Sequence, residues 1–174
     1  MKRLGLVLIL LTSIIYADTI NEYNLPPEPD PKINNSTLLG IDANDNGVRD
    51  DVERWIYKTY NHPIKRGIFM QSARAYNMVI IDSSKAHETT KYSDNALACE
   101  FYWIYEHNPR PFDKYEHFRH DKKLKTIQFN TIKRHMAYER YNAEFSRKVL
   151  SAPGASQAKC EFDENGILGE LKEK

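Results

Sequence analysis

The chain contains few cysteines and few glycines, and its only long apolar run lies in its first residues. Its 174 residues include 2 cysteines and 7 glycines against 11 tyrosines. So few glycines argue against a fold built from many tight turns. Hydrophobic residues make up 41% of the chain, which argues against intrinsic disorder. The length suits one domain, so we expect a single globular domain of packed helices.

The chain also lacks an excess of either charge. The formal net charge is +1, from 25 basic and 24 acidic residues. Lys2 and Arg3 belong to the N-terminal segment, so its removal would leave 23 basic and 24 acidic residues. A balance this close to neutral gives no general attraction to nucleic acid or to an anionic membrane. We therefore expect no nucleic-acid partner.

Residues 1–17, MKRLGLVLILLTSIIYA, have the organisation of a Sec-type bacterial signal peptide. Lys2 and Arg3 precede an apolar run from Leu4 to Ile15, and Ala17 is a small residue suited to cleavage. The run is shorter than the roughly 20 residues that a spanning helix needs, although a membrane anchor remains the alternative. No later stretch is comparably apolar. We predict cleavage after Ala17, a periplasmic or secreted protein, and no stable membrane insertion after cleavage.

The two cysteines, Cys99 and Cys160, both lie in the mature part of the chain. In an exported protein an isolated pair most simply forms a disulfide. The alternative, a reactive thiol, needs a reducing compartment or an unpaired cysteine. We predict a disulfide that ties the C-terminal tail to the centre of the domain.

Residues 18–37 are predicted to form an extended arm that lies on the domain or serves as a tether, because Pro26, Pro27, Pro29 and Pro31 fall within six positions. Residues 38–174 are predicted to form a single helical domain. Apolar residues there recur at helical spacing, and turn residues separate the segments. The expected fold is all-α, a bundle of about four helices, with the apolar helix 93–107 at its centre. The predicted helices cover residues 48–60, 64–87, 93–107 and 122–150, with a shorter one at 113–120.

Residues 42–53, DANDNGVRDDVE, place oxygen-bearing groups at regular positions of a twelve-residue loop. Calcium binds six to eight oxygens at about 2.3–2.6 Å, and alternate residues of a tight loop can supply them. Gly47 occupies position 6, where the chain must turn sharply. The spacing predicts a calcium (Ca²⁺) site. Its expected ligands are Asp42, Asn44, Asn46, the carbonyl of Val48, Asp50 and Glu53.

This loop resembles the calcium loop of the EF-hand family, with two departures. Position 8 is Arg49 instead of an aliphatic residue, and the sequence contains no second loop. The loop is therefore more similar to the isolated loops of thrombospondin type 3 repeats and dockerin modules. That resemblance implies a structural calcium ion in an exported protein. The alternative is a metal-free turn that caps the following helix.

Residues 25–60 also resemble the N-terminus of a group of small exported bacterial proteins. The likeness is carried by a Pro-rich arm that leads into the stretch GIDANDNGVRDDVE. It implies export and a calcium loop, and it implies no activity.

The leading hypothesis is a non-enzymatic, calcium-stabilised module that binds an unknown protein or a cell-envelope partner. The runner-up is a small envelope hydrolase that uses His87, Glu88, Glu100 and His107, with Glu100 as its best clue. A cleft lined by Glu100 and a histidine favours the enzyme, and a sealed core favours the binding module. A third hypothesis is an inhibitor or immunity-type protein, because residues 107–148 carry 11 basic and 5 acidic residues. Glu116, His117 and His120 are spaced as a minor alternative metal site, with His107 as a further candidate ligand.

Overall fold

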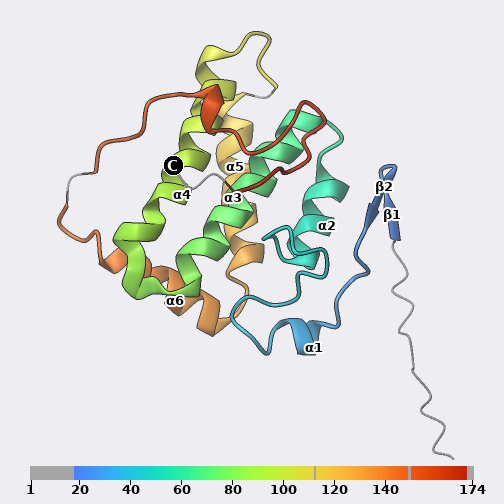
Figure 1. Ribbon diagram of the computed structural model, residues 1–174, viewed down its shortest axis with the longest axis vertical. Coiled ribbons are helices and arrows are strands. Elements are labelled where there is room, and N and C mark those ends of the chain that lie inside the picture. The colour runs from blue at the N-terminus through green and yellow to red at the C-terminus, as the bar shows by residue number, and fades with distance from the viewer. Residues whose placement is uncertain (1–17, 112, 149, 172–174) are drawn as a thin grey trace, which may run out of the picture.

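The computed structural model describes residues 18–111, 113–148 and 150–171, so the predicted signal peptide lies outside the described residues. These residues form six α-helices and a two-stranded sheet (Figure 1). The prediction of a mainly helical fold is confirmed. None of the described helices is long and apolar enough to cross a membrane. The elements are β1 Asp18–Ile20, β2 Tyr23–Leu25, α1 Pro31–Asn34, α2 Asp50–Thr59, α3 Pro63–Ile81, α4 Ala86–Phe101, α5 Lys114–Gln128 and α6 Ile132–Ala143.

Helix α3 is the central helix of the domain, and α2, α4, α5 and α6 all contact it. Its side chains are buried on nearly every turn, with Phe69, Ala73 and Val79 at most 1% exposed. The prediction that residues 93–107 lie at the centre is wrong. Leu97 is only partly buried and Tyr105 is 48% exposed, because this segment covers α3 from one side only.

Two predicted helix boundaries also differ from the observed ones. Asp82 ends α3 in an extended conformation, and its carboxylate accepts a hydrogen bond from the Ser84 amide. Helix α4 therefore begins at Ala86, earlier than expected. The second difference lies within the predicted helix 122–150. Thr131 caps a new helix, α6, there and separates it from α5, which runs unbroken from Lys114 to Gln128. Both caps are short polar side chains that satisfy amides at a helix start, a signal that apolar spacing does not register.

The arm is more structured than the expected extended path. Strands β1 and β2 form an antiparallel hairpin whose turn residues, Asn21 and Glu22, both have positive φ angles. The hairpin lies beside α2 (Figure 1). Arg54 of α2 holds the arm, because its guanidinium donates to the Asp18 carboxylate at 2.7 Å and the Glu28 carboxylate at 2.8 Å. The arm is therefore packed on the domain.

Arg134 of α6 holds the end of the arm and is fully buried. Its guanidinium donates to the carbonyl oxygens of Asn34, at 2.6 Å, and Leu38, at 2.8 Å. It also donates to the side-chain oxygen of Asn35 at 2.9 Å. Burial lowers the pKa of this guanidinium to about 10, and nearby Arg49 contributes to the shift. Burial of this charge is tolerated because main-chain and amide oxygens surround it.

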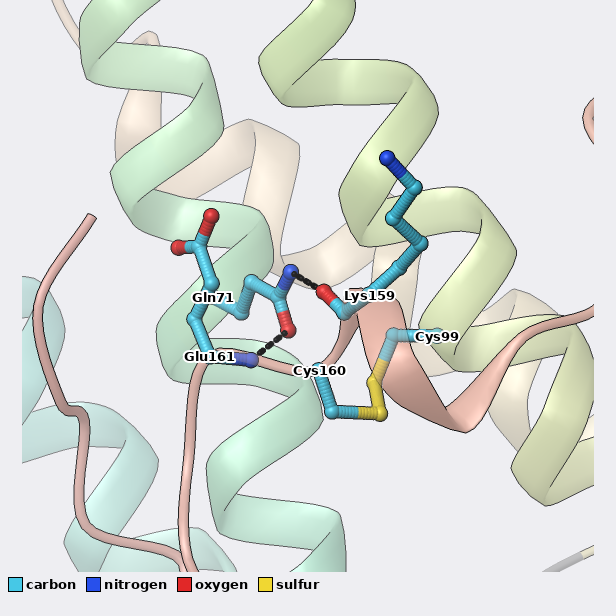
Figure 2. The surroundings of a disulfide bond; sticks show 5 residues. All are labelled: Gln71, Cys99, Lys159, Cys160 and Glu161. Carbon is cyan, nitrogen blue, oxygen red and sulfur yellow. Dashed lines mark hydrogen bonds between the residues drawn. A yellow bond between two sulfur atoms is a disulfide. The ribbon is translucent and has the colours of Figure 1, made fainter. Parts of the chain in front are cut away.

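The C-terminal tail returns to α4 and is fixed there by a disulfide between Cys99 and Cys160, which confirms the predicted pair. Figure 2 shows Gln71 of α3 beside this bond. The Gln71 amide group donates to the Lys159 carbonyl at 2.9 Å and accepts from the Glu161 amide at 3.1 Å. The tail is thus bonded to both α3 and α4.

Candidate functional site

The predicted calcium loop, residues 42–53, leads directly into α2. The Asp50 amide donates to the Ile41 carbonyl at 2.8 Å, which brings the two ends of the loop together. Gly47 has a φ of +83°, so position 6 does turn as the sequence pattern requires. Val48 and Asp50 are almost fully buried. The loop is therefore a compact turn at the N-terminus of a helix, where negative charge is favoured.

Asp42, at the first loop position, folds the loop around its carboxylate. Its oxygens accept hydrogen bonds from the Asn46 amide at 3.2 Å and the Gly47 amide at 2.8 Å. The side-chain oxygen of Asn46 in turn accepts from the Val48 amide at 2.8 Å. Both predicted ligands face into the loop, where they bond to main-chain amides.

Glu53, at the last loop position, meets two of the predicted ligands. The Asn44 amide group donates to its Oε2 at 3.1 Å, and the Asn46 amide group donates to its Oε1 at 2.9 Å. An amide that turns by half a rotation presents its oxygen where its nitrogen was. Asn44, Asn46 and Glu53 are thus placed so that flips of the two amides would direct oxygens toward a shared cation.

Ionisation of the acidic side chains of the loop costs free energy, because these side chains are partly buried. Burial raises the pKa of Glu53 to about 7, while its hydrogen bonds from Asn44 and Asn46 act in the opposite direction. Burial also raises the pKa of Asp42 and of Asp50. The charge of Asp42 contributes to the upward shifts of both Glu53 and Asp50. A bound divalent cation would reverse this cost, since an opposite charge favours the ionised forms.

The loop carboxylates do not form a ready cluster. Across residues 18–111, 113–148 and 150–171, no group of three or more His, Cys, Asp or Glu side chains is arranged to hold a metal ion. The predicted ligand set also contains two asparagines and a carbonyl oxygen, which such a group would not include. The carboxylates influence one another's ionisation, yet their oxygens point to amide donors. The donor chemistry fits calcium, and a cation would have to displace the hydrogen bonds between the asparagines and Glu53.

Arg49, the residue that departs from the EF-hand pattern, has its own docking site. Its side chain is fully buried and pairs with Asp51. The guanidinium also donates to the carbonyl oxygens of Ile127, at 2.8 Å, and Gln128, at 3.0 Å. These carbonyls end α5 and have no intrahelical partner of their own. Arg49 therefore fastens the loop to the C-terminus of α5 instead of supporting the strand pairing of twin loops.

Two further contacts to the loop come from α3, and neither was predicted from the sequence. Arg74 donates to the Asn46 carbonyl at 2.9 Å, and Asn77 donates to the Gly47 carbonyl at 2.8 Å. Arg74 also bonds the tail, through the Glu161 carboxylate and the Gly169 carbonyl. An arginine and an asparagine within the apolar stretch of α3 were the available signal. Their positions mark polar side chains that need buried partners.

A second candidate site is a cavity of about 410 Å³ between α3, α4 and α5, in the size range of small-molecule pockets. Apolar side chains make most of its wall, and several polar groups interrupt them. Phe118 and Tyr105 line it although they are 62% and 48% exposed. The apolar lining residues are Ala75, Ala96, Leu97, Phe101, Ile104, Tyr105 and Phe118, and the polar ones are Ser72, Tyr76, Ser93, Glu100, His117, Asp121 and Lys125.

The charged and hydrogen-bonded groups of this cavity form two separate sets. Nε2 of His117 lies 2.6 Å from Oε1 of Glu100. Separately, the carboxylate of Asp121 accepts from the Tyr76 hydroxyl at 2.9 Å and from the Lys125 ammonium group at 2.8 Å. The cavity therefore combines an apolar wall with one carboxylate–imidazole pair and one internally paired aspartate.

The four residues proposed for a hydrolase are not brought together. Only Glu100 lines the cavity. His87 and Glu88 are exposed at the start of α4, and His87 lies 2.9 Å from the Lys148 ammonium group. His107 packs against Trp103 instead. The histidine that meets Glu100 is His117 of α5, on the opposite wall of the cavity.

The alternative metal site at Glu116, His117 and His120 is dispersed. Glu116 pairs with Lys65 at 2.8 Å, and His117 turns toward Glu100. His120 packs against Tyr60 and Phe69.

A search against family models, curated proteins and solved structures finds no match to this chain.

Proposed function

We propose that this chain is an exported calcium-binding helical protein in which calcium is structural and the folded surface binds a partner. The observation that carries the calcium assignment is the arrangement of Asn44 and Asn46 around Glu53 within one turn. Asp42, Asn44, Asn46, the Val48 carbonyl, Asp50 and Glu53 would hold the ion. Calcium would neutralise acidic groups that burial disfavours and would fix the loop against α3 and α5.

Export is supported by two independent features. The apolar segment of residues 1–17 has the pattern of a signal peptide. The disulfide between Cys99 and Cys160 is compatible with an oxidising compartment. A loop that uses carboxylates also suits a compartment where calcium is plentiful.

The test is the thermal midpoint of oxidised residues 18–174 in calcium and in a chelator. Binding to the native state alone would stabilise it by about 2.7 kcal/mol at a hundredfold excess of calcium over its Kd. Asp42→Asn should abolish the calcium shift. Asp45→Asn is the matched control, because Asp45 is in the same loop but is not a predicted ligand. A native protein with no shift, or a shift that Asp42→Asn leaves intact, contradicts the proposal.

A second candidate function, a small hydrolase, is favoured by the contact between Glu100 and His117 in an open cavity. A cavity lined by Glu100 and a histidine is the feature expected of the enzyme, and a sealed core is the feature expected of the binding module. Glu100 would act as a general acid or base, and His117 would hold its carboxylate in place. Chromogenic esters, amides and glycosides can be assayed with the native protein and with Glu100→Gln. Turnover that Glu100→Gln abolishes would support this function, and no turnover with any of the three classes would exclude these substrates.

A further inference from the structure

We propose that the cavity between α3, α4 and α5 binds a small amphipathic amine, with the apolar body against α4 and the ammonium group at Glu100. This inference names a ligand class for the binding role proposed above, and it rests on that role. It does not depend on the calcium ion, because the cavity and the loop share no lining residue.

The wall of the cavity suits an apolar body. Ala96 and Ala75 are small side chains that leave room between α4 and α3, and Leu97, Phe101 and Ile104 supply the apolar surface. A pocket with mostly apolar walls and a few placed polar groups is the usual form of a small-molecule site. The exposed ring of Phe118 on α5 extends this apolar surface to solvent. An apolar ligand therefore has both a route in and a place to be buried.

The charge of the lining selects the polar end of the ligand. Glu100 and Asp121 are acidic and Lys125 is basic, so the lining carries one net negative charge when histidine is counted as neutral. Asp121 is already satisfied, since one oxygen accepts from Tyr76 and the other from Lys125. Lys125 is likewise engaged by Asp121 and is not free to pair with an anion. The unbalanced charge is therefore that of Glu100.

The carboxylate of Glu100 is well placed for an ammonium group. Its side chain is 13% exposed, and Oε1 faces His117. Oε2 has no hydrogen-bond partner among the described residues, so a carboxylate oxygen remains for a ligand. A partly buried carboxylate binds a charged donor more strongly than a neutral one. An amine satisfies this oxygen and balances the charge, whereas a carboxylic acid would add a second negative charge beside it.

Binding can be measured by calorimetry and by ¹H–¹⁵N NMR with oxidised residues 18–174 at pH 8, where an ordinary imidazole is neutral. The probes are 2-phenylethylamine, its neutral N-acetyl derivative and 3-phenylpropanoate. We expect the amine to bind at least about tenfold more tightly than the amide, a factor worth roughly 1.4 kcal/mol, and the acid not to bind. Chemical shifts should change at the α4 and α5 residues that line the cavity.

Two variants and one control locate the site. Glu100→Gln should weaken amine binding at least about tenfold while the neutral amide is unaffected. Ser93→Phe should fill the cavity and abolish binding of both. Glu88→Gln, the same change on an exposed part of α4, should leave binding intact. Each variant's unfolding midpoint must match that of the native protein for its binding result to count, and Glu100→Asn is the replacement if Glu100→Gln does not fold.

Equal affinity for the amine and its acetyl derivative would overturn the proposal, as would no binding of the amine at about 10 mM. Amine binding that survives Glu100→Gln would also overturn it. Repeating the titration in a chelator separates this failure from failure of the calcium proposal. Amine binding without a calcium shift leaves the cavity assignment standing, whereas a calcium shift without amine binding refutes only the cavity assignment.

Discussion

Arg74 of α3 and Glu161 of the C-terminal tail form a buried ion pair, with Nη1 3.4 Å from Oε2 and both side chains less than a tenth exposed. Burial lowers the pKa of Arg74, and the charge of Glu161 offsets part of that effect. The same guanidinium bonds the Asn46 carbonyl of the predicted calcium loop. One side chain therefore joins two segments more than a hundred residues apart in the sequence.

Glu161→Gln should destabilise the protein by about 3 kcal/mol, because it removes the carboxylate that pairs with buried Arg74. Urea unfolding at neutral pH measures the loss. Glu164→Gln is the control, since that residue is exposed on the same tail. A cost below about 1 kcal/mol for Glu161→Gln, similar to that of an exposed pair, would contradict this account.

Gly47→Ala should cost about 1–2 kcal/mol, because a residue with a side chain at a φ of +83° is strained. An added Cβ would also lie 3.0 Å from Cγ of Arg74. Gly154→Ala makes a matched control, as its added Cβ meets nothing within 4 Å and its φ is outside the left-handed region. The control should be neutral or slightly stabilising. Equal effects of the two substitutions in thermal unfolding would argue against a strained turn at Gly47.

Removal of the disulfide by Cys99→Ala with Cys160→Ala should cost roughly 4 kcal/mol, because the bond closes a loop of 61 positions. Chemical unfolding of the double variant beside the oxidised native protein gives this value. Treatment with a reductant should destabilise the native protein by a similar amount and leave the double variant unchanged. If reduction has no effect on the native protein, the tail is held by its hydrogen bonds alone.

Acidification should destabilise the protein through His62 and His120. Burial is the main cause that lowers the pKa of each below its ordinary value of 6.5. Around His120, Lys65 and Arg119 lower the pKa further, and Glu116 opposes them. Because the folded pKa lies below the unfolded one, the stability is fully present above about pH 6.5 and is lost as pH falls through the folded value.

The test is the difference in unfolding free energy between the native protein and His120→Asn from pH 7.5 to pH 5, because Glu53, whose pKa is raised to about 7, stabilises the fold as pH falls and does so in both proteins. His120→Asn should flatten part of the pH dependence, and His135→Asn provides the control because His135 is exposed on α6. An identical pH dependence in the native protein and in His120→Asn would show that His120 does not contribute.

Local sequence patterns predicted several features of the fold. Apolar spacing correctly indicated a mainly helical domain, and the pair of cysteines correctly predicted the disulfide. The glycine at loop position 6 correctly marked a turn with positive φ. These features depend on residues that are close in the sequence or on the pairing of two cysteines, and both kinds of information can be read from the sequence. The calcium ion itself stays a prediction.

Other features depend on which helices meet in space. Apolar content alone placed residues 93–107 at the centre, but α3 lies there with Arg66, Arg74 and Asn77 buried along it. Their partners include Tyr23 of the arm, Gly47 of the loop and Asn165 of the tail, which no local pattern brings together. Glu100 stands out in the sequence as a polar residue in an apolar helix, but its partner His117 belongs to a different helix, α5, which the local pattern does not identify.

The docking of Arg49 on α5 makes the predicted calcium loop dependent on the rest of the domain. An excised peptide of residues 38–60 would retain every predicted ligand and lose the carbonyls of Ile127 and Gln128, together with Arg74 and Asn77. Its loop would be free to adopt many conformations. The entropic cost of ordering the loop on binding would lower its affinity for an ion. Binding of the proposed calcium ion would therefore depend on the folding of the whole domain.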